Sequence, residues 1–328
     1  MKVCIYGAGA IGGFVATRLA QVSGVEVSVV ARGSHLEAIR ARGLRVVSPE
    51  GEISARVKAT DRPAELGPQD YVFIALKQHQ LSGALDGIGE LLHETTAVLP
   101  PTTGIPFWYF YKLRGPREDN QIDRLDPGGL QWRRIGPERV LGCVYWCSAE
   151  VTEPGVVRHD GRLLRFPVGE PDGSSSPRAL GLSEVMNASG LDAPVVPDIR
   201  AWIWAKMISS LSWNPVATLT LSTQAELNAD PEIVDIVRRM MTEADSLAAS
   251  LGVAKMPISI DDRIAAARST GAHKMSMLQD LERGRPLETD VLLDSIEAMK
   301  GLAGLQTPTI DCLYSLLRLR SQRHHSVS

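Results

Sequence analysis

The sequence has few cysteines, few aromatic residues and no long apolar run. Four cysteines in 328 residues are too few for a disulfide framework, and Cys143 and Cys147 have no histidine nearby at zinc-ligand spacing. We therefore expect no bound metal. No segment approaches the ~18 consecutive apolar residues of a membrane span, and the first residues lack the apolar core of a signal peptide. We expect a cytoplasmic protein.

The sequence also lacks an excess of charge of either sign. Its net charge is −3, with acidic and basic residues interspersed, so no broad surface field would attract nucleic acid or an anionic membrane. We expect neither as a partner and look instead for a small-molecule ligand. The 44% hydrophobic content and the chain length suffice for two domains of ordinary size.

The two parts of the chain differ in hydrophobic pattern. In the first hundred residues, short β-branched runs such as 2–7, 25–31 and 71–76 alternate with helical patterns, which indicates βαβ units and a parallel sheet covered on both faces. After Asp198 only helical spacing remains. The sequence predicts an α/β protein: a Rossmann-type doubly wound domain over 1–197, followed by an all-α domain over 198–328.

A glycine pattern follows the first strand and opens a helix. The segment "GAGAIG" consists of Gly7, Ala8, Gly9, Ala10, Ile11 and Gly12. In a dinucleotide site the first glycine permits the tight turn, the second lets the backbone approach a pyrophosphate, and the third allows close helix packing. The alternative is a tight strand-to-helix turn without a ligand.

Two cations follow later strands of the predicted sheet. Arg32 stands after the second strand, where an NAD site would carry an acidic residue for the ribose, and a guanidinium there favours the phosphate of NADP. Lys77 follows the run 71–76, at the sheet edge where ligands bind. The alternatives are a solvated arginine at a loop tip and a lysine that reaches water from the sheet edge.

An aromatic run stands out in a chain that is only 5% aromatic. It lies in "LPPTTGIPFWYFY", residues 99–111, and a stretch rich in Pro, Gly and Arg continues to residue 139. Phe107, Trp108 and Tyr109 either form core or wall a pocket. The excursion over 105–139 could contact a substrate or a partner subunit.

Five segments together resemble the ketopantoate reductase (2-dehydropantoate 2-reductase) family. They are "GAGAIG", "ALKQHQ", "PGVVRHDG", "WAKMISSLSWNPVATLT" and "SMLQDLERGRPLETD", and the resemblance runs from residue 1 to about residue 305. It implies NADPH-dependent reduction of a 2-keto acid to a 2-hydroxy acid, with ketopantoate as the default substrate. It also implies that both ligands bind in a cleft between a Rossmann-type and a helical domain, and a homodimer is compatible with it.

The resemblance also implies roles for individual residues. Lys206 matches the catalytic lysine and Glu288 the essential acid; Ser210, Asn214 and Ser276 match substrate-binding positions; Thr103, Gly104 and Ala149 match positions that contact the cofactor. The chemistry agrees, because hydride addition to a ketone leaves an alkoxide that a cationic donor can stabilise and protonate. The alternatives are a solvated helix lysine, a helix-terminating asparagine and a first-turn glutamate that only favours the helix dipole.

Two positions depart from the family pattern. Thr103 and Ser210 stand where the family usually has asparagine, and each change replaces an amide with a shorter hydroxyl side chain. Three outcomes stay open: ketopantoate reduction, a related reductase or dehydrogenase for another 2-keto or hydroxy acid, and a non-catalytic NADPH-binding sensor.

Overall fold

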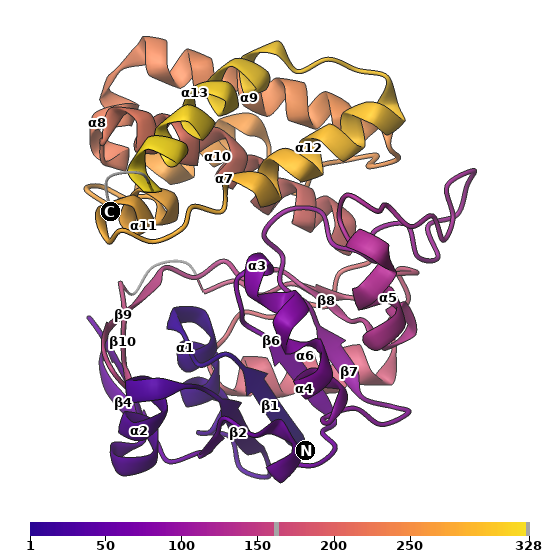
Figure 1. Ribbon diagram of the computed structural model, residues 1–328, viewed down its shortest axis with the longest axis vertical. Helices are drawn as coiled ribbons and strands as arrows, with labels where there is room; N and C mark the ends of the chain where they lie inside the picture. The colour runs from indigo at the N-terminus through magenta and orange to yellow at the C-terminus, as the bar shows by residue number, and fades with distance from the viewer. Residues whose placement is uncertain (161–163, 326–328) are drawn as a thin grey trace. The chain divides into compact units, whose positions relative to one another are not determined.

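The computed structural model describes residues 1–160 and 164–325, and the chain divides into two compact units (Figure 1). The first unit comprises Met1–Thr102 and Pro106–Ile199, and the second comprises Thr103–Ile105 and Arg200–Ser328. The first contains a parallel sheet with flanking helices, and the second is helical. The predicted fold class is confirmed.

A five-stranded parallel sheet forms the centre of the first unit. Its strands are β1 (Lys2–Tyr6), β2 (Glu26–Val30), β5 (Lys58–Thr60), β6 (Tyr71–Ile74) and β7 (Ala97–Leu99), in the order β5-β2-β1-β6-β7. All neighbouring pairs run parallel. Apart from Lys2, Glu26 and Ser28, the residues of the central strands β1, β2 and β6 are apolar, because helices cover both faces of the sheet.

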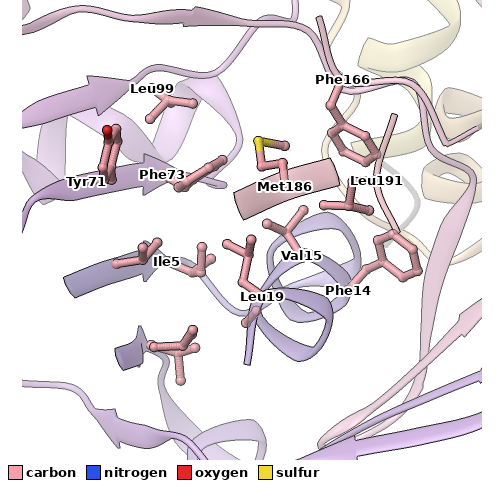
Figure 2. Close-up of a cluster of buried hydrophobic side chains, with 14 of the residues drawn as sticks. Ile5, Phe14, Val15, Leu19, Tyr71, Phe73, Leu99, Phe166, Met186 and Leu191 are labelled. Atoms are coloured by element: carbon pink, nitrogen blue, oxygen red, sulfur yellow. The ribbon is translucent and has the colours of Figure 1, made fainter. Parts of the chain in front are cut away.

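Side chains alternate between the two faces of β1. Ile5 points to the face covered by α1 (Ala10–Leu19) and α6 (Pro177–Ala188), and Figure 2 shows it near Leu19, with Met186 beside Phe73 of β6. Tyr6 points to the other face, where its hydroxyl packs closely on Gly87 of α4 (Leu85–Gly89). A Cβ added to Gly87 would lie 2.5 Å from the Tyr6 hydroxyl oxygen. Helices on both faces make the sheet doubly wound.

Two smaller sheets complete the first unit. One contains β3 (Leu44–Ser48), β4 (Gly51–Ala55), β9 (Ala149–Glu153) and β10 (Val156–His159) in the order β4-β3-β10-β9, and the other pairs β8 (Gly142–Cys143) with β11 (Val168–Gly169). Strands β9 and β10 form an antiparallel hairpin, while β10 also pairs in parallel with β3. The remaining elements of this unit are α2 (Gly33–Arg42), α3 (Gln78–Leu81), α5 (Leu130–Arg134), and the 3-10 turns η1 (Pro63–Glu65), η2 (Ser82–Ala84), η3 (Pro127–Gly129) and η4 (Pro137–Arg139).

The aromatic run is part of the core of the first unit. Phe107, Trp108, Tyr109 and Phe110 are each at most 5% exposed. The ring of Phe107 packs edge-on against Trp132 of α5. Burial of this kind supports the core alternative for the run rather than the pocket wall.

Helices are the only regular secondary structure of the second unit within the described residues. They are α7 (Ile199–Thr220), which begins at the last residue of the first unit, α8 (Gln224–Ala229), α9 (Pro231–Ser250), α10 (Ile260–Arg268), α11 (Ser276–Glu282), α12 (Thr289–Ala303) and α13 (Pro308–His325). Helix α9 contacts α8, α10, α12 and α13, and Val237, Met240 and Leu247 along it are fully buried. Within the described residues, none of the helices is both long enough and apolar enough to cross a membrane.

Candidate functional site

The glycine-rich turn joins β1 to α1. Gly7 has a φ of +104°, which L side chains rarely adopt, and a Cβ there would lie 2.8 Å from Leu76 Cδ2. A Cβ on Gly12 would lie 1.9 Å from the Gly7 carbonyl oxygen, so α1 packs this closely only because glycine is present. At Gly9, the N-cap of α1, a Cβ would meet no atom within 4 Å. The backbone at Gly9 therefore leaves room for a ligand.

The first turn of α1 suits an anion. The backbone N–H groups at the start of a helix lack intrahelical acceptors and carry the positive end of the helix dipole. Ala10 and Ile11 are half-buried, and the turn contains no acidic residue that would repel a phosphate. These features, with the open side of Gly9, fit the pyrophosphate of a nicotinamide dinucleotide.

Arg32 lies directly after β2 and forms the N-cap of α2. Its side chain is exposed, and the first turn of α2 contains no acidic residue. The guanidinium lies near the hydroxyl of Tyr6 at the end of β1 and favours the ionised form of that phenol. Burial raises the pKa of Tyr6, and the neighbouring Arg32 charge partly offsets that rise. The Tyr6 phenol therefore stays protonated at neutral pH beside Arg32.

The predicted cofactor residues at strand ends share one edge of the sheet. The last residue of β1, Tyr6, pairs with Val30 of β2 and Ile74 of β6, so the segments that follow these three strands begin side by side. Lys77 follows β6 as the half-buried N-cap of α3. Ala149 comes from a different sheet, where it begins β9 opposite His159.

The loop with Thr103 and Gly104 belongs to the second unit. The Ile105 backbone N–H donates to Ser295 Oγ of α12 at 2.9 Å, and Ser295 is 1% exposed. Gly104 has a φ of +88°, and a Cβ there would lie 2.5 Å from the same oxygen. Glycine at 104 and serine at 295 together fix this loop against α12.

Helix α7 carries Lys206, Ser210 and Asn214 on one face, because the three stand four residues apart. Lys206 and Ser210 are half-buried, whereas Asn214 is 3% exposed. The Asn214 amide donates to the Ser210 carbonyl at 3.0 Å and accepts from the Met277 N–H at 3.1 Å. Asn214 thus stabilises the first turn of α11 from a neighbouring helix.

Ser276 and Glu288 lie at the starts of two helices. Ser276 opens α11, is exposed, and its hydroxyl lies 3.5 Å from Asn214 Oδ1, so the structure brings these two predicted substrate residues together. Glu288 is the half-buried N-cap of α12. One alternative given above for Glu288 was a first-turn glutamate, whereas α12 begins one residue later, at Thr289.

Sequence reasoning missed Tyr6 and Ser295. Tyr6 ends an apolar strand and has the pattern of a core residue, so nothing local indicates that it lies near Arg32. Ser295 stands on the buried stripe of α12 between Leu292 and Met299. A hydroxyl on an otherwise apolar helix face needs a partner, and this was a usable signal for Ser295.

Comparison with protein families gives two matches that together cover more than half of the chain. A family model described as ketopantoate reductase PanE/ApbA matches residues 3–105, and one described as ketopantoate reductase PanE/ApbA C terminal matches residues 198–321. A curated protein of Mesorhizobium japonicum named 2-dehydropantoate 2-reductase is 48% identical over 319 residues, 97% of each chain. One of the same name from Pyrococcus horikoshii is 28% identical and covers 98% of this chain and 97% of its own.

Solved structures agree on the fold. The 2-dehydropantoate 2-reductase of Geobacter metallireducens superimposes with a TM-score of 0.84 at 27% identity, covering 98% of this chain and 100% of its own. A D-mandelate dehydrogenase in complex with NADH and anilino(oxo)acetate has a TM-score of 0.80 at 23% identity, covering 99% of this chain and 100% of its own. The second likeness concerns the fold alone.

Proposed function

The chain belongs to the ketopantoate reductase family, and we propose that it reduces 2-dehydropantoate (ketopantoate) to pantoate with NADPH. The observation that carries the proposal is the similarity to a 2-dehydropantoate 2-reductase over nearly the whole of both chains. We assign nucleotide binding to residues 1–197, and substrate binding and catalysis to residues 198–328.

Lys206 is the proposed proton donor. A bound nicotinamide nucleotide supplies the hydride. As the ketone carbon accepts it, negative charge develops on the carbonyl oxygen, and an ammonium group within hydrogen-bond reach stabilises that charge and then transfers a proton. Lys206 provides the ammonium from α7, and the Glu288 carboxylate accepts a hydrogen bond from a substrate hydroxyl.

Ser276 and Asn214 have different proposed tasks. The Asn214 amide is already engaged by the Met277 N–H and the Ser210 carbonyl. Ser276 is exposed and lies beside Asn214. We assign substrate contact to the Ser276 hydroxyl, and to Asn214 the positioning of the turn that presents it.

The finer cofactor assignment, NADPH rather than NADH, depends on Arg32. A guanidinium binds a phosphate through paired charge-assisted hydrogen bonds, and only NADPH has a phosphate on the 2′ oxygen of the adenosine ribose. Arg32→Ala should weaken NADPH binding by about ten- to a hundredfold and leave NADH binding nearly unchanged, as measured by fluorescence titration. Equal affinities for the two nucleotides in the unaltered protein would contradict the assignment.

The activity is tested by mixing the protein, NADPH and ketopantoate and following nicotinamide absorbance, with pantoate identified by chromatography. A panel of other 2-keto acids serves as the comparison. We expect ketopantoate to give the highest kcat/KM. If NADPH binds tightly but no keto acid is reduced, the reductase proposal is wrong and the protein is a nucleotide-binding protein without catalysis.

A further inference from the structure

Helix α2 places the imidazole of His35 against a backbone carbonyl of the glycine-rich turn, that of Ala8. His35 lies in the first turn of α2 and is half-buried. Its Nε2 is 2.6 Å from the Ala8 carbonyl oxygen, and its Nδ1 is 3.1 Å from the Gly155 backbone nitrogen in the turn between β9 and β10. One side chain therefore connects three segments of the first unit.

The two partners of His35 fix its tautomer. A backbone N–H can only donate, so Nδ1 must be the unprotonated acceptor for Gly155. The hydrogen of the neutral ring then resides on Nε2, which donates to the Ala8 carbonyl. Each ring nitrogen thus has one role, and the imidazole is held at both ends.

The bond to Ala8 determines the direction of a neighbouring N–H group. The peptide between Ala8 and Gly9 is trans and planar, so its C=O and N–H point in opposite directions. Because His35 holds the Ala8 carbonyl on one side, the Gly9 N–H points away from His35. Gly9 is the N-cap of α1 and the glycine whose Cβ would meet no atom within 4 Å.

The hairpin turn that holds His35 is itself fixed. Gly155 has a φ of +82°, and its carbonyl accepts from the Arg45 N–H at 2.9 Å. A Cβ on Gly155 would lie 3.3 Å from the Cβ of Ala38 in α2, so the turn packs closely on that helix. The imidazole is therefore oriented by a rigid neighbour.

We propose that His35 is a positioning residue for the dinucleotide: it orients the Ala8–Gly9 peptide so that the Gly9 N–H is directed at the pyrophosphate. The inference rests on the nucleotide binding assigned under the proposed function. Since NADPH and NADH share the pyrophosphate, His35 affects both equally, whereas Arg32 distinguishes them.

Three substitutions separate the two bonds of His35. His35→Ala removes both. His35→Gln keeps an N–H donor near the position of Nε2, and His35→Asn keeps an acceptor near the position of Nδ1. Dissociation constants for NADPH and NADH are measured by fluorescence titration of the full chain, together with kcat, KM for each substrate and the melting temperature.

His93→Ala is the matched control. His93 is also half-buried, and its Nδ1 also accepts from a backbone N–H, that of Thr95 at 3.3 Å. It precedes β7 at the opposite end of the parallel strands from the glycine-rich turn. We expect no change in nucleotide affinity for this variant.

We expect His35→Ala to raise the dissociation constants of NADPH and NADH by a common factor of about three to ten, the loss of one ordinary hydrogen bond. His35→Gln should recover most of the affinity and His35→Asn should not, with KM for the keto acid unchanged. Equal behaviour of the Gln and Asn variants, or a loss for NADPH alone, would overturn the inference while leaving the proposed function intact. Failure of the unaltered protein to bind either nucleotide would overturn both.

Discussion

At the scale of single residues, Lys206 on α7 carries the proposed proton transfer. Lys206→Ala removes the ammonium group, so kcat should fall by about a hundred- to ten-thousandfold, the usual contribution of a general acid. Nucleotide affinity should change little, because the proposed nucleotide contacts lie on other elements. Steady-state kinetics and fluorescence titration separate the two quantities, and a parallel loss in both would indicate damage to folding instead of lost chemistry.

Ser295 offers a second test on one side chain. Its hydroxyl donates to the Val291 carbonyl at 2.8 Å and accepts from the Ile105 N–H at 2.9 Å. Ser295→Ala leaves that buried N–H without its acceptor, which should lower the free energy of unfolding by about 1–3 kcal/mol in urea titration.

The control for Ser295 is Ser315→Ala on α13. Ser315 makes the same kind of bond to the carbonyl four residues earlier, that of Asp311 at 2.7 Å, and is exposed. Its loss should cost less than about 0.5 kcal/mol. Equal effects of the two substitutions would mean that the bond to Ile105 contributes nothing to stability.

At the scale of elements, α7 contains a proline in its interior. Pro215 has no N–H, so the Leu211 carbonyl, four residues earlier, loses its helical donor. The hydroxyl of Tyr314 in α13 donates to that carbonyl at 3.3 Å and is fully buried. A contact between two helices thus compensates for a defect within one of them.

Tyr314→Phe tests this compensation. The substitution keeps the ring and removes the donor, so the buried Leu211 carbonyl is left unsatisfied and the free energy of unfolding should fall by about 1–2 kcal/mol. Chemical denaturation followed by circular dichroism measures the change. An unchanged midpoint would show that the carbonyl does not depend on Tyr314.

At the scale of the whole molecule, buried thiols and phenols make stability depend on alkaline pH. Burial raises the pKa of the Cys4 thiol from 9.0 to about 12, a rise only partly offset by the nearby Ser28 side chain. Burial also raises the pKa of Cys143 and of Tyr145. In the unfolded chain these groups ionise at their ordinary values.

The sign follows from proton binding. Above pH 9 the unfolded chain releases the Cys4 proton while the folded chain keeps it. The free energy of unfolding therefore has its full value below pH 9 and falls as the pH rises from 9 toward 12. Urea titrations under reducing conditions should show that the free energy of unfolding falls by about 1.4 kcal/mol per pH unit for each such group. Cys4→Ala should have a shallower slope, and an identical slope would contradict the role of this thiol.

Much of the fold was predictable because its signals are local. The runs of β1, β2 and β6, the glycine turn and the helical spacing after Asp198 each depend on neighbours within a few residues. Contacts between distant segments were not predictable in this way. Ile105 meets Ser295 across 190 positions and Gly155 meets His35 across 120, and no local pattern encodes either pairing.

The sequence by itself determined the fold class, the glycine-rich turn after the first strand and the family, because periodicity, glycine spacing and ordered motifs are properties of the chain alone. Only the tertiary structure decided that the aromatic run after Pro106 is core, that the Asn214 amide stabilises the start of α11, and that His35 holds the Ala8 carbonyl. The physical reason is that a polar group's role depends on which partner packing brings within hydrogen-bond distance, and packing is fixed only when the whole unit folds.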